Sequence, residues 1–230
     1  MKKVIGIAAG RKYDNYLNWI LKDPDAEIIK LGYEDNNFDM ITHCHGLVLS
    51  GGEDVHPRFY GKPEYFAQYN LDDVDEARDE FEWKLLRYSE EHRLPVLGIC
   101  RGLQIANAYY GGTLIPDIPS YGKPDHTKFG EGKDRNHDIA IARGSLLEEI
   151  TGASQGQVNS AHHQGVAEPA KELAVCAVSN DGIVEAMERK DRANQPFLLL
   201  VQWHPERMTD QLSVLSKNIR ERLIESIHVH

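Results

Sequence analysis

The sequence predicts an α/β fold with a mostly parallel central sheet, helices on both of its faces, and a small antiparallel sheet in addition. Two observations support this prediction. Short apolar segments alternate with helical stretches through the first half of the chain, and repeated strand–helix units build parallel sheets that are covered on both faces. The runs Pro95–Ile99 and Phe197–Val201 are apolar, as expected of core strands. Sheets of this class carry their sites at the carboxyl ends of the strands.

The first predicted strand is Val4–Ala8, and the apolar run that contains it stops at Arg11 and Lys12. An apolar run this short favours a first core strand over a signal peptide. The other elements of the first half are expected to be helices at about Tyr13–Leu21, Leu71–Glu91 and Leu103–Tyr110, and strands at Ala26–Leu31, Gly46–Leu49 and Pro95–Ile99.

The helix expected over Leu71–Glu91 has an apolar side and an acidic side. Val74, Phe81, Leu85 and Tyr88 provide the apolar positions, which are spaced for packing. We expect the acidic side to be solvated, as charge runs usually are. Its residues are Asp72, Asp73, Asp75, Glu76, Asp79, Glu80 and Glu82.

Between Thr113 and Phe197 the pattern changes to shorter strands, which favours antiparallel hairpins. These strands are expected at Asp138–Ala142, Leu173–Val178 and Ile183–Glu188. An apolar stripe near the end of the chain predicts a closing amphipathic helix, and we assign this stripe to the core. Its residues are Leu212, Leu215, Ile219, Leu223 and Ile227. Because no linker, low-complexity tract or repeat interrupts the chain, residues 1–230 are expected to form one domain.

Composition limits the classes of function. The chain has 230 residues, enough for a substantial core, and its net charge of -10 argues against a nucleic-acid surface. No segment is long and apolar enough to span a bilayer, so a soluble, cytoplasmic protein is expected. The three cysteines are an odd number without zinc-site or disulfide-scaffold spacing, which favours a reducing compartment. Cys44 and Cys176 lie in apolar, strand-like contexts and are expected to be packing residues.

Cys100 lies between two glycines at the point where a strand is expected to turn into a helix. The segment Gly98–Gly102 has the small-x-nucleophile-x-small form of a nucleophile elbow, with a thiol in place of a hydroxyl. Glycines flank such a residue because a Cβ at either position would collide with the turning backbone. The positive end of the helix dipole would favour the thiolate. The alternative is a buried structural cysteine before an ordinary helix start.

A base and its orienting carboxylate are predicted near the end of the chain, where a strand-like run is followed by His204, Pro205 and Glu206. Proline disfavours a helix at the preceding residue, so an extended segment is expected, with His204 and Glu206 on the same side. Glu206 would then fix the imidazole tautomer while the other ring nitrogen accepts the Cys100 proton. In isolation, these three residues would more often form a surface turn.

Together, these motifs resemble the class I glutamine amidotransferase superfamily, and more narrowly its gamma-glutamyl-gamma-aminobutyrate hydrolase family, the C26 peptidases. The resemblance extends from about residue 4 to about residue 206. It implies a flavodoxin-like class I glutamine amidotransferase fold. The segments that carry it, besides the two motifs above, are Gly51–Gly61, Asp75–Glu82, Gly111–Ile118, Val158–Gln164 and Asp181–Ala186.

Backbone N–H groups of Gly52 and Arg101 are the candidate oxyanion donors, because attack on an amide creates an oxyanion that needs preformed donors. The resemblance implies the same two positions. An ordinary tight turn is the alternative for Gly51 and Gly52. The resemblance also implies a substrate contact for Gln104, and a pocket-lining loop that contains Asn159, Ser160, His162, His163 and Gln164. One of the two histidines is expected to touch substrate and the other to pack.

No metal and no organic cofactor are expected. Adjacent residues on a strand point to opposite faces, so only one of His162 and His163 could enter a site. The same objection applies to the segment His43–His45, and no third ligand lies at suitable spacing. His126 and His137 are expected to be solvent-exposed loop residues.

The main hypothesis is therefore a cysteine hydrolase that cleaves gamma-glutamyl amides through a gamma-glutamyl thioester. The alternatives are a glutaminase subunit that delivers ammonia to a separate synthetase, and a catalytically silent binding module. His45, Pro116 and Gly165 depart from the family pattern, and the last two concern the leaving amine rather than the reaction. A small-molecule gamma-glutamyl substrate is expected, without nucleic acid, membrane or synthetase partner, and a homodimer is compatible with the sequence.

Overall fold

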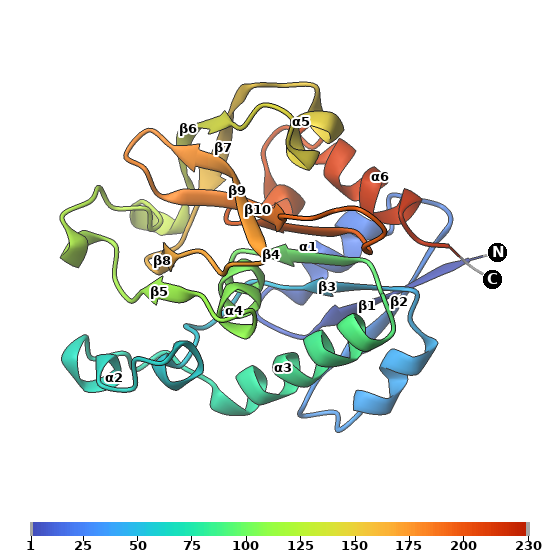
Figure 1. The fold of residues 1–230 in the computed structure, drawn as a ribbon, viewed down its shortest axis with the longest axis horizontal. Coiled ribbons are helices and arrows are strands. Elements are labelled where there is room, and N and C mark those ends of the chain that lie inside the picture. Colours follow the sequence, from blue (N-terminus) through green and yellow to red (C-terminus); the bar gives the residue numbers. More distant parts are fainter. Residues whose placement is uncertain (1, 229–230) are drawn as a thin grey trace.

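The computed structural model describes residues 2–228 and contains the predicted α/β fold (Figure 1). Its large sheet has a parallel half and an antiparallel half. The strands of the parallel half are β1 (Lys3–Ala8), β2 (Ala26–Leu31), β3 (Gly46–Leu49), β4 (Val96–Ile99) and β11 (Leu198–Val201). The strands of the antiparallel half are β6 (Arg135–Ile141), β7 (Gln155–Ser160), β9 (Leu173–Ser179) and β10 (Val184–Arg189). Their order across the sheet is β2-β1-β3-β4-β11-β10-β9-β6-β7.

The central strands of the parallel half are buried on both faces. Every residue of β3, β4 and β11 is buried, and β11 pairs in parallel with β4 so that Val201 lies opposite Ile99. Alternate residues of β11 pack into different cores: Leu199 and Val201 into one, Leu198 and Leu200 into the other. This explains the continuous apolar runs in the sequence, because a strand covered on both faces needs no polar side.

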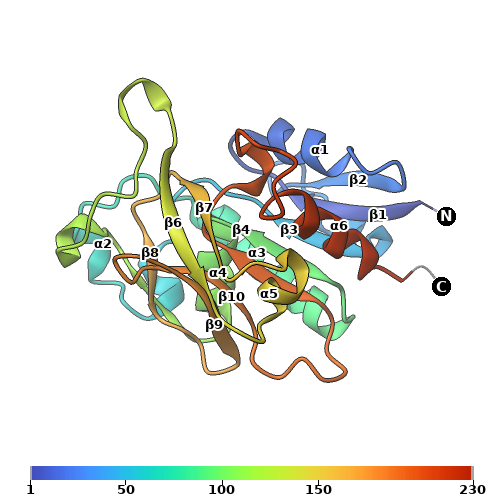
Figure 2. The ribbon, with the colours of Figure 1, turned by 90° about the horizontal axis from the view of Figure 1, so that it is seen from above.

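Helices cover each face of the parallel half. The helices α1 (Tyr13–Ile20) and α6 (Lys217–Glu225) lie next to each other on one face, where Trp19 Nε1 donates to Ser216 Oγ at 3.0 Å (Figure 2). The helices α3 (Glu76–Glu91) and α4 (Arg101–Tyr109) cover the other face. The predicted layers are therefore confirmed.

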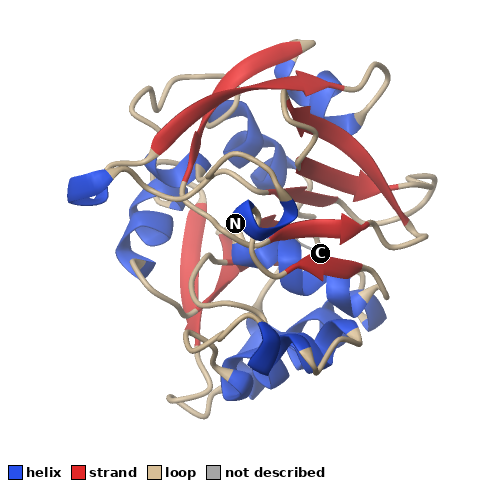
Figure 3. Cartoon of the chain, turned by 90° about the vertical axis from the view of Figure 1, so that its left-hand side faces the viewer, coloured by secondary structure: helices blue, strands red, loops and turns tan. Residues whose placement is uncertain are grey.

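The antiparallel strands continue the large sheet and do not form a separate layer, as the strands in Figure 3 show. A separate two-stranded antiparallel sheet is made by β5 (Thr113–Ile115) and β8 (Gly165–Glu168), in which Leu114 pairs with Val166. The sequence pattern did not single out these two strands, nor β7. Each of β5 and β8 has three or four residues, too few for a clear alternation.

The acidic helix starts later than predicted. α3 begins at Glu76 rather than near Leu71, because the Asp75 side chain caps it by accepting a hydrogen bond from Arg78 N at 3.1 Å. Val74, in front of this cap, forms an isolated bridge with Asp54.

The expectation that the acidic side is solvated was wrong for two residues of α3. Asp79 and Glu82 are 0% and 1% exposed. Each forms an ion pair with the buried guanidinium of Arg101, and Glu82 also pairs with Arg78. Buried carboxylates of this kind need cationic partners, and here the partner residue Arg101 lies on a neighbouring helix, which spacing along α3 cannot reveal.

The closing helix is shorter than predicted. Leu215, Ile219, Leu223 and Ile227 are buried as expected, whereas Leu212 is 77% exposed. Local side chains explain the later helix start, since Asp210 Oδ1 accepts from Leu212 N at 2.9 Å and Ser213 Oγ accepts from Leu215 N at 3.3 Å. Such bonds favour turns over helix.

The remaining α-helices are the short α2 (Tyr65–Gln68) and α5 (Leu146–Thr151), and 3₁₀ turns lie at Phe38–His43, Pro57–Tyr60, Pro119–Tyr121, Gly130–Gly132 and Pro205–Arg207. α5 is capped at its start by Ser145, whose hydroxyl accepts from Glu148 N at 3.0 Å, and at its end by Gly152, with φ 66°. Among residues 2–228, no helix has the length and apolar character that a membrane crossing requires.

Candidate active site

Cys100 occupies the sharp turn between β4 and α4, with φ 54° and ψ -104°. Its N–H donates to Val201 O at 2.8 Å, which anchors the turn to β11. The two flanking glycines are required for steric reasons. A Cβ on Gly98 would lie 2.7 Å from Gly102 O, and a Cβ on Gly102 would lie 2.3 Å from Leu49 O. The turn has the backbone of a nucleophile elbow, with the thiol at the carboxyl end of β4.

His204 and Glu206 come together directly after β11. His204 Nδ1 lies 2.9 Å from Glu206 Oε1, and both residues are buried. The prediction of an extended segment was wrong, because Pro205–Arg207 forms a 3₁₀ turn. Proline is well suited to the first position of such a turn, and the turn still brings Glu206 back toward the imidazole. The backbone is held by His204 N, which donates to Asn159 Oδ1 at 3.0 Å.

Charge interactions couple the thiol to the imidazole. Burial would raise the pKa of the Cys100 thiol, but the hydrogen bond and charge of His204 outweigh burial and lower it below its ordinary value. For His204, burial would lower the pKa, yet the charges of Glu206 and Cys100 raise it to about 9. Both shifts favour a thiolate–imidazolium pair, the reactive form of a nucleophilic cysteine.

The Gly51–Gly52 turn lies against this pair. A Cβ on Gly51 would approach His204 Cε1 to 3.0 Å and Cys100 Cβ to 3.5 Å, so glycine allows close contact here. Gly51 N already donates to the Tyr16 hydroxyl at 2.9 Å, which leaves Gly52 N as the candidate donor of this turn. The Arg101 N–H is at the first position of α4, where backbone donors lack partners within the helix.

Arg78 fixes the turn that carries Gly52, a role that the sequence did not suggest. Its Nη2 donates to Gly51 O at 3.0 Å, to Ser50 O at 3.2 Å and to Ser50 Oγ at 3.0 Å. Its Nε donates to Glu82 Oε1 at 2.8 Å, and the other oxygen of Glu82 pairs with Arg101. One buried ionic network therefore joins the segments of both candidate oxyanion donors.

A cavity of about 260 Å³ opens over the thiol. Four of the predicted substrate-binding residues line it: Gln104, His162, His163 and Gln164. Asn159 and Ser160 lie on β7 instead of the expected loop and are not in the cavity wall; Ser160 Oγ donates to His126 O at 2.7 Å. The other residues of the wall are Arg11, Lys12, Tyr16, Gly51, Gly52, Glu53, Asp54, Asp73, Cys100, Lys128, Ala161, His204, Glu206 and Arg207.

Both histidines of the predicted pair line this cavity, through different contacts. His162 is almost fully buried, and its Nδ1 lies 2.8 Å from Gln164 O. His163 Nε2 lies 2.8 Å from Asp54 Oδ1, a hydrogen bond that raises the pKa of His163. Gln104 Nε2 donates to Gln164 O at 3.1 Å, so its amide group faces the same wall.

The expectation of solvent-exposed loop positions for His126 and His137 was wrong. His126 is 4% exposed, and His137 lies on β6 with a side chain that is 20% exposed. Both rings face the carboxylate of Glu185 on β10. Residues so far apart in sequence meet only because β6, β9 and β10 lie side by side in the sheet.

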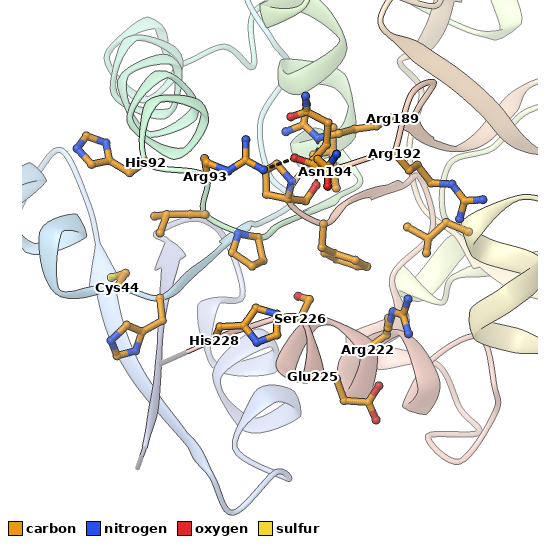
Figure 4. Close-up of a pocket in the computed structure, with 18 of the residues that line it drawn as sticks. Cys44, His92, Arg93, Arg189, Arg192, Asn194, Arg222, Glu225, Ser226 and His228 are labelled. Carbon is orange, nitrogen blue, oxygen red and sulfur yellow. Dashed lines mark hydrogen bonds between the residues drawn. The ribbon is translucent and has the colours of Figure 1, made fainter. Parts of the chain in front are cut away.

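A larger cavity, of about 850 Å³, lies at the opposite end of the parallel strands (Figure 4). Its wall contains His45, Pro95 and Phe197, which precede β3, β4 and β11. Arg189 and Arg192 also belong to this wall, but they already pair with Glu90 and Glu149. Because the sites of such sheets lie at the carboxyl ends of the strands, we assign the active site to the smaller cavity.

Comparisons with known proteins show which sequences and folds the chain is similar to. The family model for Peptidase C26 matches residues 28–206. A Schizosaccharomyces pombe protein, provisionally named as a glutamine amidotransferase, is 36% identical over 166 residues, which are 72% of this chain. The chain spans only 63% of that relative's length, and 54% of a Mycobacterium tuberculosis relative with the same provisional name.

Gamma-glutamyl-gamma-aminobutyrate hydrolase PuuD of Escherichia coli is 31% identical over 199 residues, covering 83% of this chain and 75% of PuuD. Among solved structures, a glutamine amidotransferase from Methylobacillus flagellatus superposes over 100% of this chain and 97% of its own. The TM-score is 0.70 at 15% identity, so this likeness concerns the fold. The class I glutamine amidotransferase fold is thereby confirmed.

Proposed function

The chain belongs to the peptidase C26 family, and from this premise we propose that it is a cysteine-dependent hydrolase of gamma-glutamyl amides. Membership supports a hydrolase that acts on amide bonds. The observation that carries the finer proposal is the arrangement of Cys100, His204 and Glu206: a buried thiol coupled to an imidazole whose other nitrogen contacts a carboxylate at 2.9 Å. This is the constellation of nucleophile, base and orienting group.

In the proposed acylation, the Cys100 sulfur attacks the side-chain carbonyl carbon of the gamma-glutamyl group. The thiol proton resides on His204, and the N–H groups of Gly52 and Arg101 stabilise the oxyanion. When the tetrahedral intermediate collapses, the C–N bond breaks and His204 gives its proton to the leaving amine. A gamma-glutamyl thioester and a free amine result. Glu206 holds the ring so that the same nitrogen serves both transfers.

In deacylation, water takes the place of the amine. His204, now neutral, accepts a proton from the water molecule while the water oxygen attacks the thioester carbonyl carbon. Collapse of the second tetrahedral intermediate breaks the C–S bond, releases glutamate, and returns the proton to the thiol–imidazole pair. No metal-bound or organic group takes part in these steps.

The charges around the cavity support a substrate with an acidic leaving group. The wall carboxylates of Asp54 and Glu53 are already paired, Asp54 with His163 and Glu53 with Arg11 and Arg78. Lys12 and Lys128 lie there as well, and contact with Lys12 lowers the pKa of the Lys128 ammonium. Two neighbouring ammonium groups favour an anion between them, so we propose that the leaving amine carries a carboxylate, as in gamma-glutamyl-gamma-aminobutyrate.

The test is single-turnover mass spectrometry of the wild-type protein and of Cys100→Ala with a panel of gamma-glutamyl amides. We expect a transient glutamyl adduct on Cys100, together with faster release of a carboxylate-bearing amine than of ammonia or a polyamine. The matched control is Cys44→Ala, because Cys44 is buried at the far end of the strands and should leave the adduct unchanged.

The other outcomes distinguish the alternatives. Adduct formation from glutamine alone would favour a glutaminase subunit, in keeping with the provisional names of several relatives. Absence of adduct and turnover with every amide would leave a silent binding module. A free-standing enzyme in a reducing cytoplasm remains our proposal for its setting, with all three cysteines as free thiols.

A further inference from the structure

Three imidazole rings surround one buried carboxylate beside the active site. Glu185 on β10 is 0% exposed. Its Oε1 lies 3.1 Å from His137 Nε2, 3.7 Å from His126 Nδ1 and 3.7 Å from His162 Nε2. The four residues come from different segments of the chain: β6, β10, the loop that precedes β6, and the loop between β7 and β8. We call these four residues the His₃Glu cluster.

The inward-facing atoms of the His₃Glu cluster are poorly satisfied by one another. Within the described part of the chain, no hydrogen bond of good geometry is found for the three ring nitrogens that face Glu185, nor for either oxygen of Glu185, although His137 Nε2 lies only 3.1 Å from Glu185 Oε1. A buried carboxylate without partners is costly, and buried polar groups are nearly always satisfied. The arrangement therefore calls for a positive charge beside Glu185, which either a bound cation or a proton on one of the three rings supplies.

The outward-facing nitrogens of two rings are already engaged, which fixes the tautomers. His126 Nε2 lies 3.0 Å from Asp181 Oδ2, and His162 Nδ1 lies 2.8 Å from Gln164 O. Each of these outer nitrogens must donate, because its partner is an acceptor. The inner nitrogens of neutral rings then direct lone pairs at Glu185. Carboxylate or carbonyl groups behind histidine ligands are the usual outer shell of a metal site.

We propose that the His₃Glu cluster binds one divalent transition-metal ion, for which zinc is the best fit. Imidazole nitrogen and carboxylate oxygen are preferred zinc ligands, and four protein ligands are typical of a structural site. Bonds of about 2.0–2.1 Å place tetrahedral ligand atoms about 3.3–3.4 Å apart. The inner atoms of His126, His137 and Glu185 all lie within 4.8 Å of one another, and His162 reaches the same carboxylate oxygen.

The bound ion would act on the shape of the substrate cavity. His162 belongs to the cavity wall, whereas His126 and His137 do not. A metal held by all four residues would clamp the loop between β7 and β8, and the loop that precedes β6, onto β10. The site has a structural role in this proposal, and it leaves the thiol chemistry unchanged.

Zinc binding to the metal-stripped full-length chain tests the proposal. The Cys100→Ala background removes the catalytic thiol as a rival ligand. We expect about one equivalent of Zn²⁺ by calorimetry and metal analysis, a rise in Tm on zinc addition, and visible absorption typical of tetrahedral coordination when Co²⁺ replaces it. His137→Ala is expected to abolish all three signals. His163→Ala is the matched control and should keep them, because His163 contacts Asp54 and Asp117 instead.

Two results would overturn the proposal. Failure of the Cys100→Ala protein to bind Zn²⁺ or Co²⁺ would mean that the cluster holds a proton instead of a metal. Binding that persists unchanged in both His126→Ala and His137→Ala would place the ion elsewhere on the chain. Circular dichroism establishes that each variant is folded, and Glu185→Gln, which keeps the side-chain size, supplies an independent variant.

Discussion

The guanidinium of Arg78 donates a hydrogen bond of 3.0 Å to the carbonyl oxygen of Gly51 and thereby holds the turn that faces the Cys100 thiol. Arg78 is 3% exposed. A Cβ on Gly52, the residue after Gly51, would lie 2.0 Å from Arg78 Nη1. The glycine and the arginine therefore fit together: the missing side chain makes room for the guanidinium. The position of the Gly52 N–H depends on this contact.

Arg78→Lys is expected to lower kcat roughly 10- to 100-fold with little change in KM, because a displaced oxyanion donor weakens transition-state stabilisation. Lysine keeps the charge beside Glu82 but cannot reproduce the planar set of donors. The matched control is Arg58→Lys, whose side chain pairs with Glu76 and Glu80 on the exposed side of α3. Steady-state kinetics of both variants decide the matter, and equal losses in the two would refute a positioning role for Arg78.

Alkylation is expected to be selective for Cys100. Burial raises the pKa of Cys44 to about 12 and raises that of Cys176 as well, whereas the pKa of Cys100 lies below its ordinary value. Because the thiolate is the reacting form, iodoacetamide at pH 7 should modify Cys100 first. Peptide mass spectrometry over a time course checks this order. In His204→Ala the rate at Cys100 should fall markedly; an unchanged rate would mean that His204 does not activate the thiol.

The pH dependence of activity should reflect the raised pKa of His204. Its value of about 9 lies above the ordinary 6.5, so the imidazolium persists at neutral pH and is lost as the pH rises through about 9. The profile of kcat/KM is expected to fall on the alkaline side near that pH. In Glu206→Gln, which removes the carboxylate charge, the alkaline limb should move to lower pH. An alkaline limb at the same pH in this variant would contradict the assignment.

The same shift has a consequence for stability. Since the folded-state pKa is raised, the contribution of the ionised pair is fully present below pH 6.5 and is lost as the pH rises from 6.5 through about 9. We expect the Tm of the wild-type protein to fall across this window more than that of His204→Gln. Calorimetry at several pH values compares the two proteins, and parallel curves would show that the pair makes no net contribution.

The sequence was sufficient to predict the central strands and the neighbourhood of His204 and Glu206 in the candidate site, because both depend on local signals. Cys100 lies within a five-residue elbow, and His204 and Glu206 are two residues apart. Pro205 was expected to keep the segment extended, but a 3₁₀ turn forms instead. The side chains of His204 and Glu206 nevertheless meet. A short sequence separation restricts side chains to a common neighbourhood even when the turn type is mistaken.

The parts that could not be predicted depend on contacts between distant segments. Glu82 was assigned to a solvated face, because nothing within α3 indicates that Arg101 on α4 covers it. His126 and His137 were assigned to exposed loops, and their meeting with Glu185 depends on the order of β6, β9 and β10 in the sheet. Strand order across an antiparallel sheet is a tertiary property, and spacing along the chain carries little information about it.

The lysines at the cavity should govern the choice of leaving amine. We expect Lys128→Met to raise KM for gamma-glutamyl-gamma-aminobutyrate about 3- to 10-fold, because losing one partly screened charge pair weakens binding by about that factor. The KM for glutamine should stay almost unchanged. The reason is that only the former substrate presents a carboxylate beyond the scissile bond. Lys171→Met is the matched control, since Lys171 is exposed and does not belong to the cavity wall.

The salt dependence of the wild-type enzyme separates this charge effect from a change of shape. If Lys12 and Lys128 act through charge, raising the ionic strength should increase KM for the acidic amide and not for glutamine, and this difference should shrink in Lys128→Met. Similar KM increases for both substrates in Lys128→Met would mean that the side chain supports the cavity wall rather than selecting the amine. The leaving group would then have to be recognised by other residues of the wall, with His163 and Asp54 the first to be tested.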